Sequence, residues 1–400
     1  MKKLSFIHVL AICISFASCT DHNTFSGYQT DKSRLKTIVL DNLHFEKKVI
    51  LDSLFEVSRL VFLESKEDVV IGSYDKIIIN DSLLYILDKT ITHAVYCFDL
   101  QGKFNFKISS LGEGPSEYIE LRDITIDGSL LEVLDFGGGK ILHYDKYNGN
   151  LKASLKLDRK TNYRSFEKLN GVYTVAHGNN CGLLGDCFNL SFYDERLSKK
   201  ASFFPIHDIL KKSDYRGENH FFRNLDEVYF KEVLNDTIYE INFNSGNPSA
   251  AFAIDFGQFT MPNKFKYSRN NSGFLSILEY SQKNNVTWGV YDFYKAGEIV
   301  FFRFTLNSLR SVFVDTERMK GLTFDGYTTN NPFLIGDPIG AYKDDFISQL
   351  PAERIISILK NNFYTEDSIA LRALQKEFFE TTQNFQASDN SILIFYQVRL

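Results

Sequence analysis

The 400-residue chain has little proline, no excess of positive charge and, after its first residues, no long hydrophobic run. It contains 7 prolines and 24 glycines, so it is not a low-complexity or collagen-like sequence. Its formal net charge is −5, which argues against a nucleic-acid partner, because such partners need a basic surface. No apolar run of about 20 residues follows the N-terminal region, so we expect no membrane-spanning helix there.

The chain also lacks the sequence motifs of the common catalytic sites. It contains no G-x-S-x-G nucleophile motif and no Gly-Lys-Ser/Thr phosphate loop. The histidines His143, His177, His207 and His220 show neither i, i+4 nor H-x-H ligand spacing. We therefore predict no catalytic residue, no metal ligand and no cofactor from sequence motifs. Clustering of distant side chains in the folded chain stays open.

The first residues have the pattern of a lipoprotein signal peptide. Two lysines precede an apolar run over residues 4–17, which is shorter than the ~20 residues that a membrane-spanning helix needs. Residues 16–19, Phe-Ala-Ser-Cys, resemble the lipobox of lipoproteins, with Phe16 where Leu is usual. We predict a signal peptide over residues 1–18 and lipid attachment at Cys19. A plain secretory signal with a chance cysteine is the alternative.

The stretch that follows the signal peptide is polar and has no apolar periodicity. We therefore expect residues 19–37 to form a flexible tether and residues 38–400 to form the folded domain. Thr20 follows the cysteine directly, and Asp21 comes only after it. By resemblance to Gram-negative sorting rules, this order favours the outer membrane. We expect a lipoprotein that faces the periplasm or the cell surface and contacts the membrane through its lipid.

Three cysteines remain in the body of the chain. Cys181 and Cys187 lie in one glycine-containing segment, a spacing that suits a local disulfide in an oxidising compartment. Free thiols and a zinc site are the alternatives, although no CxxC motif or paired histidine accompanies these cysteines. Cys97 alternates like a strand residue and is expected to be a buried free thiol.

Internal repetition is the most informative feature of the sequence. The segment over residues 80–88 recurs at residues 127–135, and each copy is a β-rich run that ends in aspartate. A hairpin motif follows each copy, at residues 98–104 and 144–151. Weaker copies continue along the chain. A period of ~40–50 residues built from antiparallel strands is typical of propeller blades, which stack radially with aromatic side chains between them.

Two further segments bear on this architecture. Residues 57–64 near the start and residues 391–396 near the end are both rich in strand-forming side chains. We predict that they pair in one sheet and close the ring, because an open propeller would expose two sheet edges. Residues 366–382 show helical periodicity, so one inserted helix is expected near the C-terminus.

Part of the chain resembles a known family, the six-bladed β-propeller lipoproteins of Gram-negative bacteria with NHL-like blades. The residues that carry the resemblance are Val70-Ile71-Gly72 before the strand over 77–88, the segment 112–118 (GEGPSEY) and the segment 123–127 (DITID). Ser116 stands where this family has Gly. The resemblance implies an all-β fold, a six-bladed β-propeller of four-stranded antiparallel blades. It implies no activity, because the family has no settled one.

The GEGPSEY segment is also the most prominent candidate for a site. Its composition suits a connection between blades, because glycine and proline favour a turn and Glu117 can accept backbone N–H groups. The functional alternative places Glu113, Glu117, Tyr118 and Arg122 at the mouth of the propeller as ligand contacts. The strand-ending aspartates Asp88 and Asp135 are expected to cap turns, because they occupy equivalent places in two repeats.

Two classes of function fit this sequence. The first is an exported, lipid-anchored binding module for a glycan, a peptide or a partner protein, since a propeller offers a wide rigid face with variable loops. The second is a metal-dependent hydrolase or lyase, which needs several inward-facing oxygen ligands around an axial cation. The side chains that line the axial channel distinguish these two classes of function. Three or more oxygen ligands there would favour the enzyme, and a closed apolar channel would favour the binding module.

Overall fold

The structure is a computed structural model that describes residues 34–400 except 159, 183–186, 208–209, 213–219, 233, 267–272, 332 and 362–368. The predicted signal peptide, Cys19 and most of the predicted tether lie outside the described residues. The first strand, β1, begins at Lys36, two residues before the predicted start of the folded domain.

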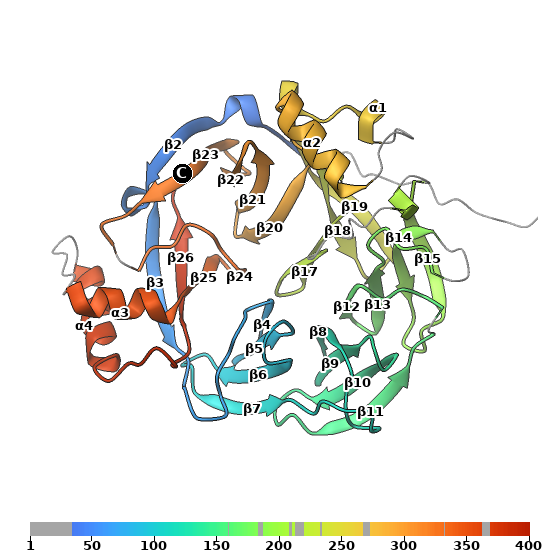
Figure 1. Cartoon of the computed structure of the whole chain (residues 1–400), viewed down its shortest axis with the longest axis horizontal. Coiled ribbons are helices and arrows are strands. Elements are labelled where there is room, and N and C mark those ends of the chain that lie inside the picture. Colours follow the sequence, from blue (N-terminus) through green and yellow to red (C-terminus); the bar gives the residue numbers. More distant parts are fainter. Residues whose placement is uncertain are drawn as a thin grey trace, which may run out of the picture.

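Six sheets stand around a central axis, and each sheet is one blade of a propeller (Figure 1). Blades 1 to 3 each come from one continuous stretch of the chain. Blade 1 contains β4 (Lys76–Asn80), β5 (Leu83–Asp88), β6 (Ala94–Asp99) and β7 (Phe104–Ile108). Blade 2 contains β8 (Leu121–Asp127), β9 (Leu130–Asp135), β10 (Lys140–Asp145) and β11 (Leu151–Lys156). Blade 3 contains β12 (Ser165–Leu169), β13 (Val172–Ala176), β14 (Phe188–Tyr193) and β15 (Lys199–Pro205).

Blades 4 to 6 also take strands from the N-terminal segment. Blade 4 contains β16 (Phe221–Asn224), β17 (Glu227–Lys231), β18 (Thr237–Asn242), β19 (Asn247–Asp255) and β1 (Lys36–Val39). Blade 5 contains β20 (Val290–Ala296), β21 (Ile299–Leu306), β22 (Ser308–Asp315), β23 (Lys320–Thr328) and β2 (His44–Ile50). Blade 6 contains β24 (Gly340–Tyr342), β25 (Asp345–Leu350), β26 (Ile392–Val398) and β3 (Phe55–Phe62).

The middle strands of each blade are buried because every blade packs between two neighbours. In blade 1, alternate side chains point to opposite faces of the sheet. Tyr85 and Cys97 pack against blade 2, whereas Ile86 and Tyr96 pack against blade 6. Six buried apolar clusters lie one at each interface between neighbouring blades. The abundant Phe and Tyr residues therefore fill the layers between blades, and Cys97 is a buried free thiol, as predicted.

The repeated polar residues fix the turns of the blades. Asp88 accepts the backbone N–H groups of Gly72 and Ile91, and its equivalent Asp135 accepts those of Ile119 and Gly138. Each aspartate therefore joins the loop after its own strand to the loop that enters its blade. This arrangement confirms the turn-capping interpretation. Aspartate or asparagine also caps the turn between the third and fourth strands of blades 1 to 5, at Asp99, Asp145, Asp194, Asn242 and Asp315.

Strands from the N-terminal and C-terminal parts of the domain close the ring, as predicted. β26 pairs antiparallel with β3, with Ile394 opposite Leu60 and Val398 opposite Phe55. Blade 6 therefore combines three strands from the C-terminal part with one from the N-terminal part. The six blades of four antiparallel strands also match the predicted fold.

The N-terminal segment adds a feature that the sequence did not predict. β1 pairs parallel with β19, and β2 pairs parallel with β23, so blades 4 and 5 each carry a fifth, outermost strand. In Figure 1 this segment runs along the outside of the ring before β3 closes it. It covers the sheet edges of two blades that would otherwise be exposed.

Four α-helices occur among the described residues: α1 (Asn263–Lys266), α2 (Phe274–Asn284), α3 (Ala352–Asn361) and α4 (Ile369–Thr381). Only α4 was predicted. α3 and α4 lie at the outer side of blade 6 (Figure 1), where Ile355, Ile358 and Phe378 join the cluster between blades 5 and 6. Short 3₁₀ turns occur at Leu40–Asn42, Leu51–Ser53, Leu210–Lys212 and Gly257–Phe259. None of the helices in the described ranges is long and apolar enough to cross a membrane.

Candidate functional site

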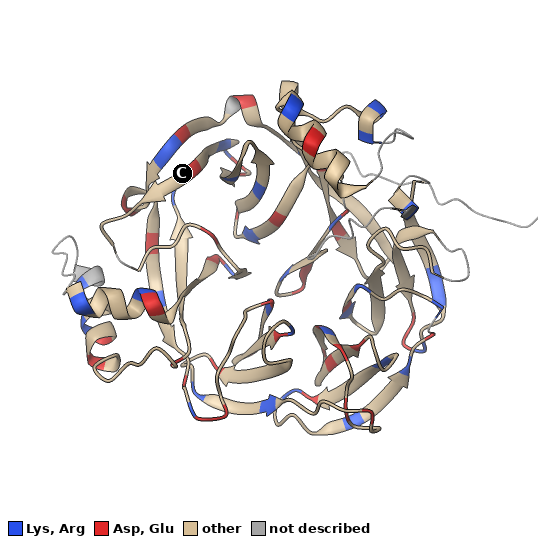
Figure 2. Ribbon diagram, viewed as in Figure 1, with Lys and Arg blue, Asp and Glu red and all other residues tan. Residues whose placement is uncertain are grey.

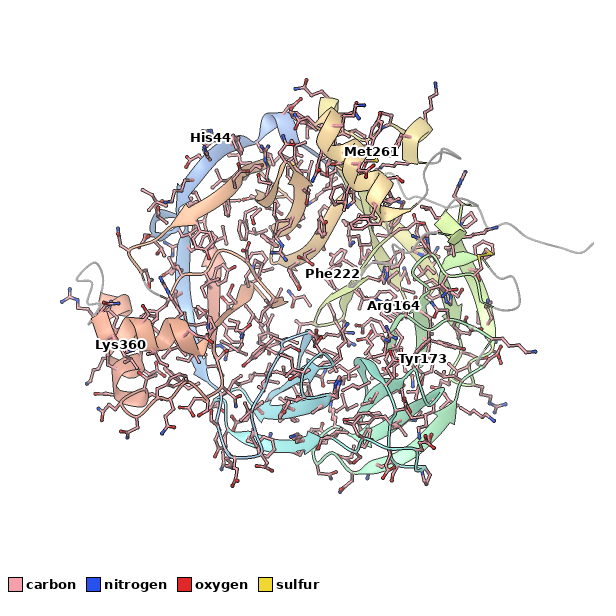
Figure 3. The ribbon with its side chains drawn as sticks, viewed as in Figure 1. His44, Arg164, Tyr173, Phe222, Met261 and Lys360 are labelled. Carbon is pink, nitrogen blue, oxygen red and sulfur yellow. A yellow bond between two sulfur atoms is a disulfide. The ribbon has the colours of Figure 1, made fainter. Side chains whose placement is uncertain are left out.

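The first strand of every blade begins on the same face of the ring, which we call the front face. Antiparallel pairing places the blade-to-blade connections and the loops between second and third strands on this face. A small cavity of about 50 Å³, the axial cavity, lies where the innermost strands begin. Figure 3 shows Arg164 and Phe222, two of its lining residues, beside the centre of the ring. By the same measure a buried water needs about 10–15 Å³, so the cavity has room for a few waters or one small charged group.

An ion network from four blades forms one wall of the axial cavity. The ammonium group of Lys76 lies 2.9 Å from Asp123 Oδ1 and 2.8 Å from Glu167 Oε1. Arg223 reaches the same buried glutamate, with Nη1 3.2 Å from Glu167 Oε2. Thr125 completes the arrangement by donating its hydroxyl to Glu167 Oε2 at 2.7 Å. The four charged groups come from β4, β8, β12 and β16, so the network holds blades 1 to 4 together at the axis.

The charged forms in this network support one another. Burial alone would lower the pKa of Lys76, but the carboxylates of Asp123 and Glu167 raise it above its ordinary value. Burial alone would raise the pKa of Glu167, but the cations Lys76 and Arg223 hold it below its ordinary value. Paired charges of this kind are stable in the interior because each has hydrogen-bonded partners. The wall is therefore permanently charged near neutral pH.

Two residues that line the axial cavity each carry a buried polar side-chain atom with no hydrogen-bond partner within the described chain. These atoms are Ser165 Oγ and Arg122 Nε. The rest of the Arg122 guanidinium is engaged, because it pairs with Glu120 and lies 4.8 Å above the ring centre of Phe136. Buried polar atoms are nearly always satisfied in native proteins, so each exception calls for an explanation. A bound group that accepts hydrogen bonds would supply one.

Basic side chains outnumber acidic ones around the axial cavity. Five cations and two carboxylates line it: Lys76, Lys89, Arg122, Arg164 and Arg223, with Asp75 and Asp123. Glu167 and Glu120 further compensate the cations that they pair with. The whole chain has a formal net charge of −5, so a basic hollow on this protein is a local feature. Figure 2 shows both signs of charge on the inner strands around the axis. A hollow with an excess of cations attracts anions.

The structure disperses the four site residues expected from the sequence. Glu117 caps its own loop, because its Oε2 accepts the Gly114 N–H at 2.8 Å. Tyr118 is fully buried, and its hydroxyl donates to the carbonyl of His93. Glu113 is exposed on the same loop. Of the four, Arg122 is the one that lines the axial cavity.

The carboxylates at the axis do not present the open oxygen ligands that an axial cation needs. Asp123 and Glu167 both face Lys76, so an ammonium group already occupies the position between them. Among the described residues, no group of three or more His, Cys, Asp or Glu side chains is arranged to hold a metal ion. The channel is thus neither a cluster of free oxygen ligands nor a closed apolar core. It is a polar cavity with more donors than acceptors.

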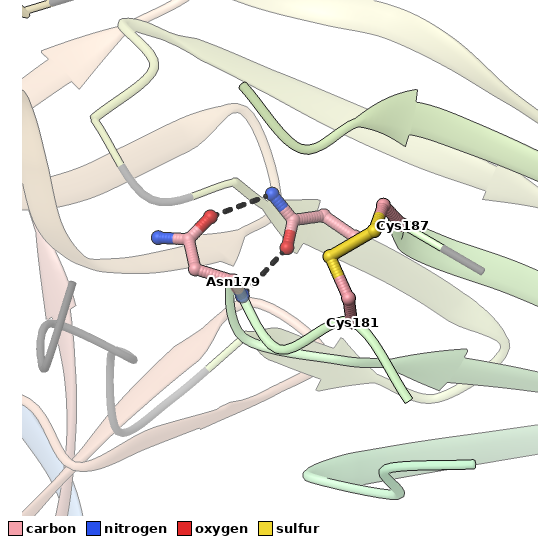
Figure 4. The surroundings of a disulfide bond; sticks show 4 residues. Asn179, Cys181 and Cys187 are labelled. Atoms are coloured by element: carbon pink, nitrogen blue, oxygen red, sulfur yellow. Dashed lines mark hydrogen bonds between the residues drawn. A yellow bond between two sulfur atoms is a disulfide. The ribbon is translucent and has the colours of Figure 1, made fainter. Parts of the chain in front are cut away.

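A disulfide lies on the front face of blade 3. It joins Cys181 to Cys187 in the segment between β13 and β14 (Figure 4). Beside it, the Asn189 side chain accepts the Asn179 N–H at 2.7 Å and donates to Asn179 Oδ1 at 2.9 Å. Both cysteines pack against the cluster beneath α2. The disulfide and the paired asparagines therefore fix the base of this segment to the body of the propeller.

Comparison with known proteins gives a family. Residues 35–397 match the family described as "Domain of unknown function (DUF4934)". The chain belongs to this family. No curated protein matches it.

Two solved structures from Bacteroides are similar to this family member. A "Putative exported protein" from Bacteroides fragilis NCTC 9343 has a TM-score of 0.73 at 18% identity, covering 92% of this chain and 100% of that one. A member of the DUF4221 family from Bacteroides vulgatus ATCC 8482 has a TM-score of 0.47 at 7% identity, covering 86% of this chain and 98% of that one. The first likeness supports the propeller fold.

Sequence reasoning missed most of the axial residues of this family member. Lys76, Ser165 and Arg223 lie in or at the start of the innermost strands of three different blades. No local motif contains them, because more than 50 residues separate each from the next. The register of the repeats is a signal that could have found them. The first strand of each blade begins at the axis, so charged residues at these positions meet there.

Proposed function

We propose that this protein is an exported, lipid-anchored binding module that holds an anionic group in its axial cavity. The observation that carries the proposal is that two residues lining that cavity have buried, unpartnered side-chain atoms, Ser165 Oγ and Arg122 Nε. Arginine has donors and no acceptor, and the hydroxyl can donate as well. A carboxylate offers only acceptors and carries the charge that the basic lining attracts. The ligand would be a glycan, a peptide or a partner protein that presents such a group.

The anchoring part of the proposal rests on the N-terminal sequence. The signal peptide over residues 1–18, the lipid at Cys19 and the tether over residues 19–37 would place the propeller at the outer membrane, facing the periplasm or the cell surface. The structural neighbour from Bacteroides fragilis is named a "Putative exported protein", which agrees with this placement. The proposed class remains the lipoprotein propellers that the sequence resembles.

The binding part can be tested with paired probes on the full chain in detergent. Tetraglutamate and tetraglutamine have the same length and differ in charge. We expect tetraglutamate to raise the melting temperature, because a ligand that binds only the folded chain adds about 2.7 kcal/mol at a hundred times its Kd. Arg122→Gln should abolish the shift. Arg318→Gln is the matched control, because Arg318 is exposed and pairs with Asp315 on the opposite face. Equal shifts with both peptides or a full shift in Arg122→Gln would contradict the proposal, and so would no shift with any acidic probe, whether peptide or sugar.

A further inference from the structure

A second and larger hollow lies on the front face between blades 2 and 3, and we call it the blade 2–3 cleft. Its volume is about 320 Å³, against about 50 Å³ for the axial cavity. The residues that line it come from three places in the chain: 136, 137 and 139; 157, 158 and 160–163; and 180–182. A hollow of this size lies at the lower end of the range of small-molecule sites, so it has room for a sugar ring.

The axial cavity and the blade 2–3 cleft share a boundary made by two stacked side chains. Arg122 lines the axial cavity, and Phe136 lines the cleft. The Arg122 guanidinium carbon lies 4.8 Å from the ring centre of Phe136. Ile119 extends this boundary, because its side chain packs over Gly137, which lies in the same loop as Phe136. Phe136 is 37% exposed and Ile119 is 48% exposed, so both offer apolar surface to a ligand that spans the two hollows.

The cleft has the mixture of groups that a sugar ring requires. Thr161 and Asn180 provide hydroxyl and amide groups, Asp158 provides a carboxylate, and Lys160 provides a cation. Phe136 adds an apolar ring face, against which the C–H groups of a sugar can pack.

The geometry of the cleft favours a sugar over a peptide. An extended peptide gains affinity by adding a strand to an exposed sheet edge. The cleft is bounded by loops, and the free edge of blade 2 is formed by β11 on the outside of the ring. The cleft therefore offers no strand edge to a peptide, whereas its side chains offer both donors and acceptors.

Resting on the proposed function, we infer that the ligand is an oligosaccharide that contains uronic acids. One uronate places its carboxylate in the axial cavity, where Arg122 Nε and Ser165 Oγ donate to it. The chain of sugars then crosses the Arg122–Phe136 boundary, and a neighbouring ring occupies the blade 2–3 cleft. In this arrangement the carboxylate, which can only accept hydrogen bonds, meets the donors of the axial cavity. The sugar hydroxyl groups, which can donate and accept, meet the donors and acceptors of the blade 2–3 cleft.

The inference can be tested by isothermal titration of the full chain in detergent. The probes are short oligosaccharides from polygalacturonate, alginate and hyaluronan, with carboxyl-reduced galacturonan as the uncharged control and tetraglutamate as the acidic peptide. We expect at least one uronate series to bind and the carboxyl-reduced form to bind at least about tenfold more weakly. Phe136→Ala should weaken uronate binding by about tenfold, the effect of removing an aromatic contact at the centre of an interface.

Tyr147→Ala is the matched control for the aromatic variant. Tyr147 is an exposed aromatic residue of the same blade, in the turn between β10 and β11 on the opposite face, so its loss should leave binding unchanged. If no uronate series binds, or if Phe136→Ala binds as the parent does, the glycan inference is wrong. Arg122-dependent binding of tetraglutamate would then leave the proposed function standing. If neither tetraglutamate nor any uronate binds, both proposals are wrong.

Discussion

Asn390, the second residue before the last strand, accepts the backbone N–H of Ile71 in the loop that enters the first blade, at 2.8 Å. Its side-chain amide donates to the carbonyls of Glu64 and Val69 at 3.0 and 2.8 Å. Asn390 is 2% exposed. One side chain thus joins the C-terminal segment to three backbone groups at the junction of blades 6 and 1, and it supports the ring closure made by β26 and β3.

Replacing Asn390 by alanine should destabilise the propeller by about 2–4 kcal/mol, because it leaves buried backbone groups without partners. Denaturant unfolding would measure the change. Asn361→Ala is the control, since Asn361 is exposed at the end of α3 and its loss should cost less than about 1 kcal/mol. A loss of similar size in both variants would show that Asn390 does not support the closure.

A second prediction concerns pH and the buried His177. Its Nδ1 lies 2.6 Å from the carbonyl of Asn162 and its Nε2 lies 3.0 Å from Ser191 Oγ. Burial lowers its pKa from 6.5 to about 4. Between these two values the unfolded chain binds a proton that the folded chain does not. The free energy of unfolding should therefore fall by about 3 kcal/mol as the pH drops from 6.5 to 4, and this contribution should level off below pH 4.

Unfolding measured against pH in His177→Gln would isolate this contribution, since the variant should lack the part of the slope that His177 causes. His44→Gln serves as the control, because His44 is exposed and its Nε2 lies 3.1 Å from Glu46 Oε1 at the surface. An unchanged slope in His177→Gln would mean that other groups produce the pH dependence.

The repeats predicted the fold because the same turns must be capped in successive blades. The aspartates Asp88 and Asp135 fill equivalent places because each caps the same two loops. The closing strands were predictable because both ends of the chain are rich in β-branched and aromatic residues. β1 escaped prediction since it has only four residues. β2 escaped prediction since its outer position leaves most of its side chains exposed, which removes the apolar alternation that reveals a strand.

The candidate site was harder to predict, for a physical reason. Its residues meet only through the closed ring, so Lys76 and Glu167 contact each other across 91 positions of sequence. The predicted segment around Glu117 drew attention through glycine and proline, which report turn geometry rather than chemistry. Arg122 belongs both to the site predicted from the sequence and to the site in the structure. It is the second residue of β8 and lines the axial cavity.

The lipid anchor gives a third prediction. Cys19→Ala should move the protein from the detergent phase to the aqueous phase of a detergent partition, because the lipid is the proposed membrane-holding element. Circular dichroism of the released protein should match that of the parent. A variant that stays with the membrane would contradict the lipoprotein proposal.

The disulfide gives a fourth prediction. Non-reducing peptide mapping of exported protein should recover Cys181 and Cys187 in one linked peptide pair. The loop that they close is short, so the double variant Cys181→Ser with Cys187→Ser should lose no more than about 2 kcal/mol of stability. Recovery of both cysteines as free thiols from exported protein would show that this prediction is wrong.

The last prediction separates a binding role from a structural role at Ser165. Ser165 lines the axial cavity, and its hydroxyl is buried and has no hydrogen-bond partner in the described chain. Ser165→Ala should therefore leave the stability of the free protein unchanged or raise it by about 1 kcal/mol, because it removes an unsatisfied polar group. The same variant should weaken the binding of tetraglutamate, since the ligand loses a donor. Ser191→Ala is the matched control. Ser191 is fully buried and contacts both His177 Nε2 and Ser202 Oγ at 3.0 Å, so its removal should cost about 1–2 kcal/mol and leave tetraglutamate binding intact. If Ser165→Ala destabilises the protein as Ser191→Ala does, the hydroxyl has a structural partner, and the axial cavity loses the observation on which its binding role depends.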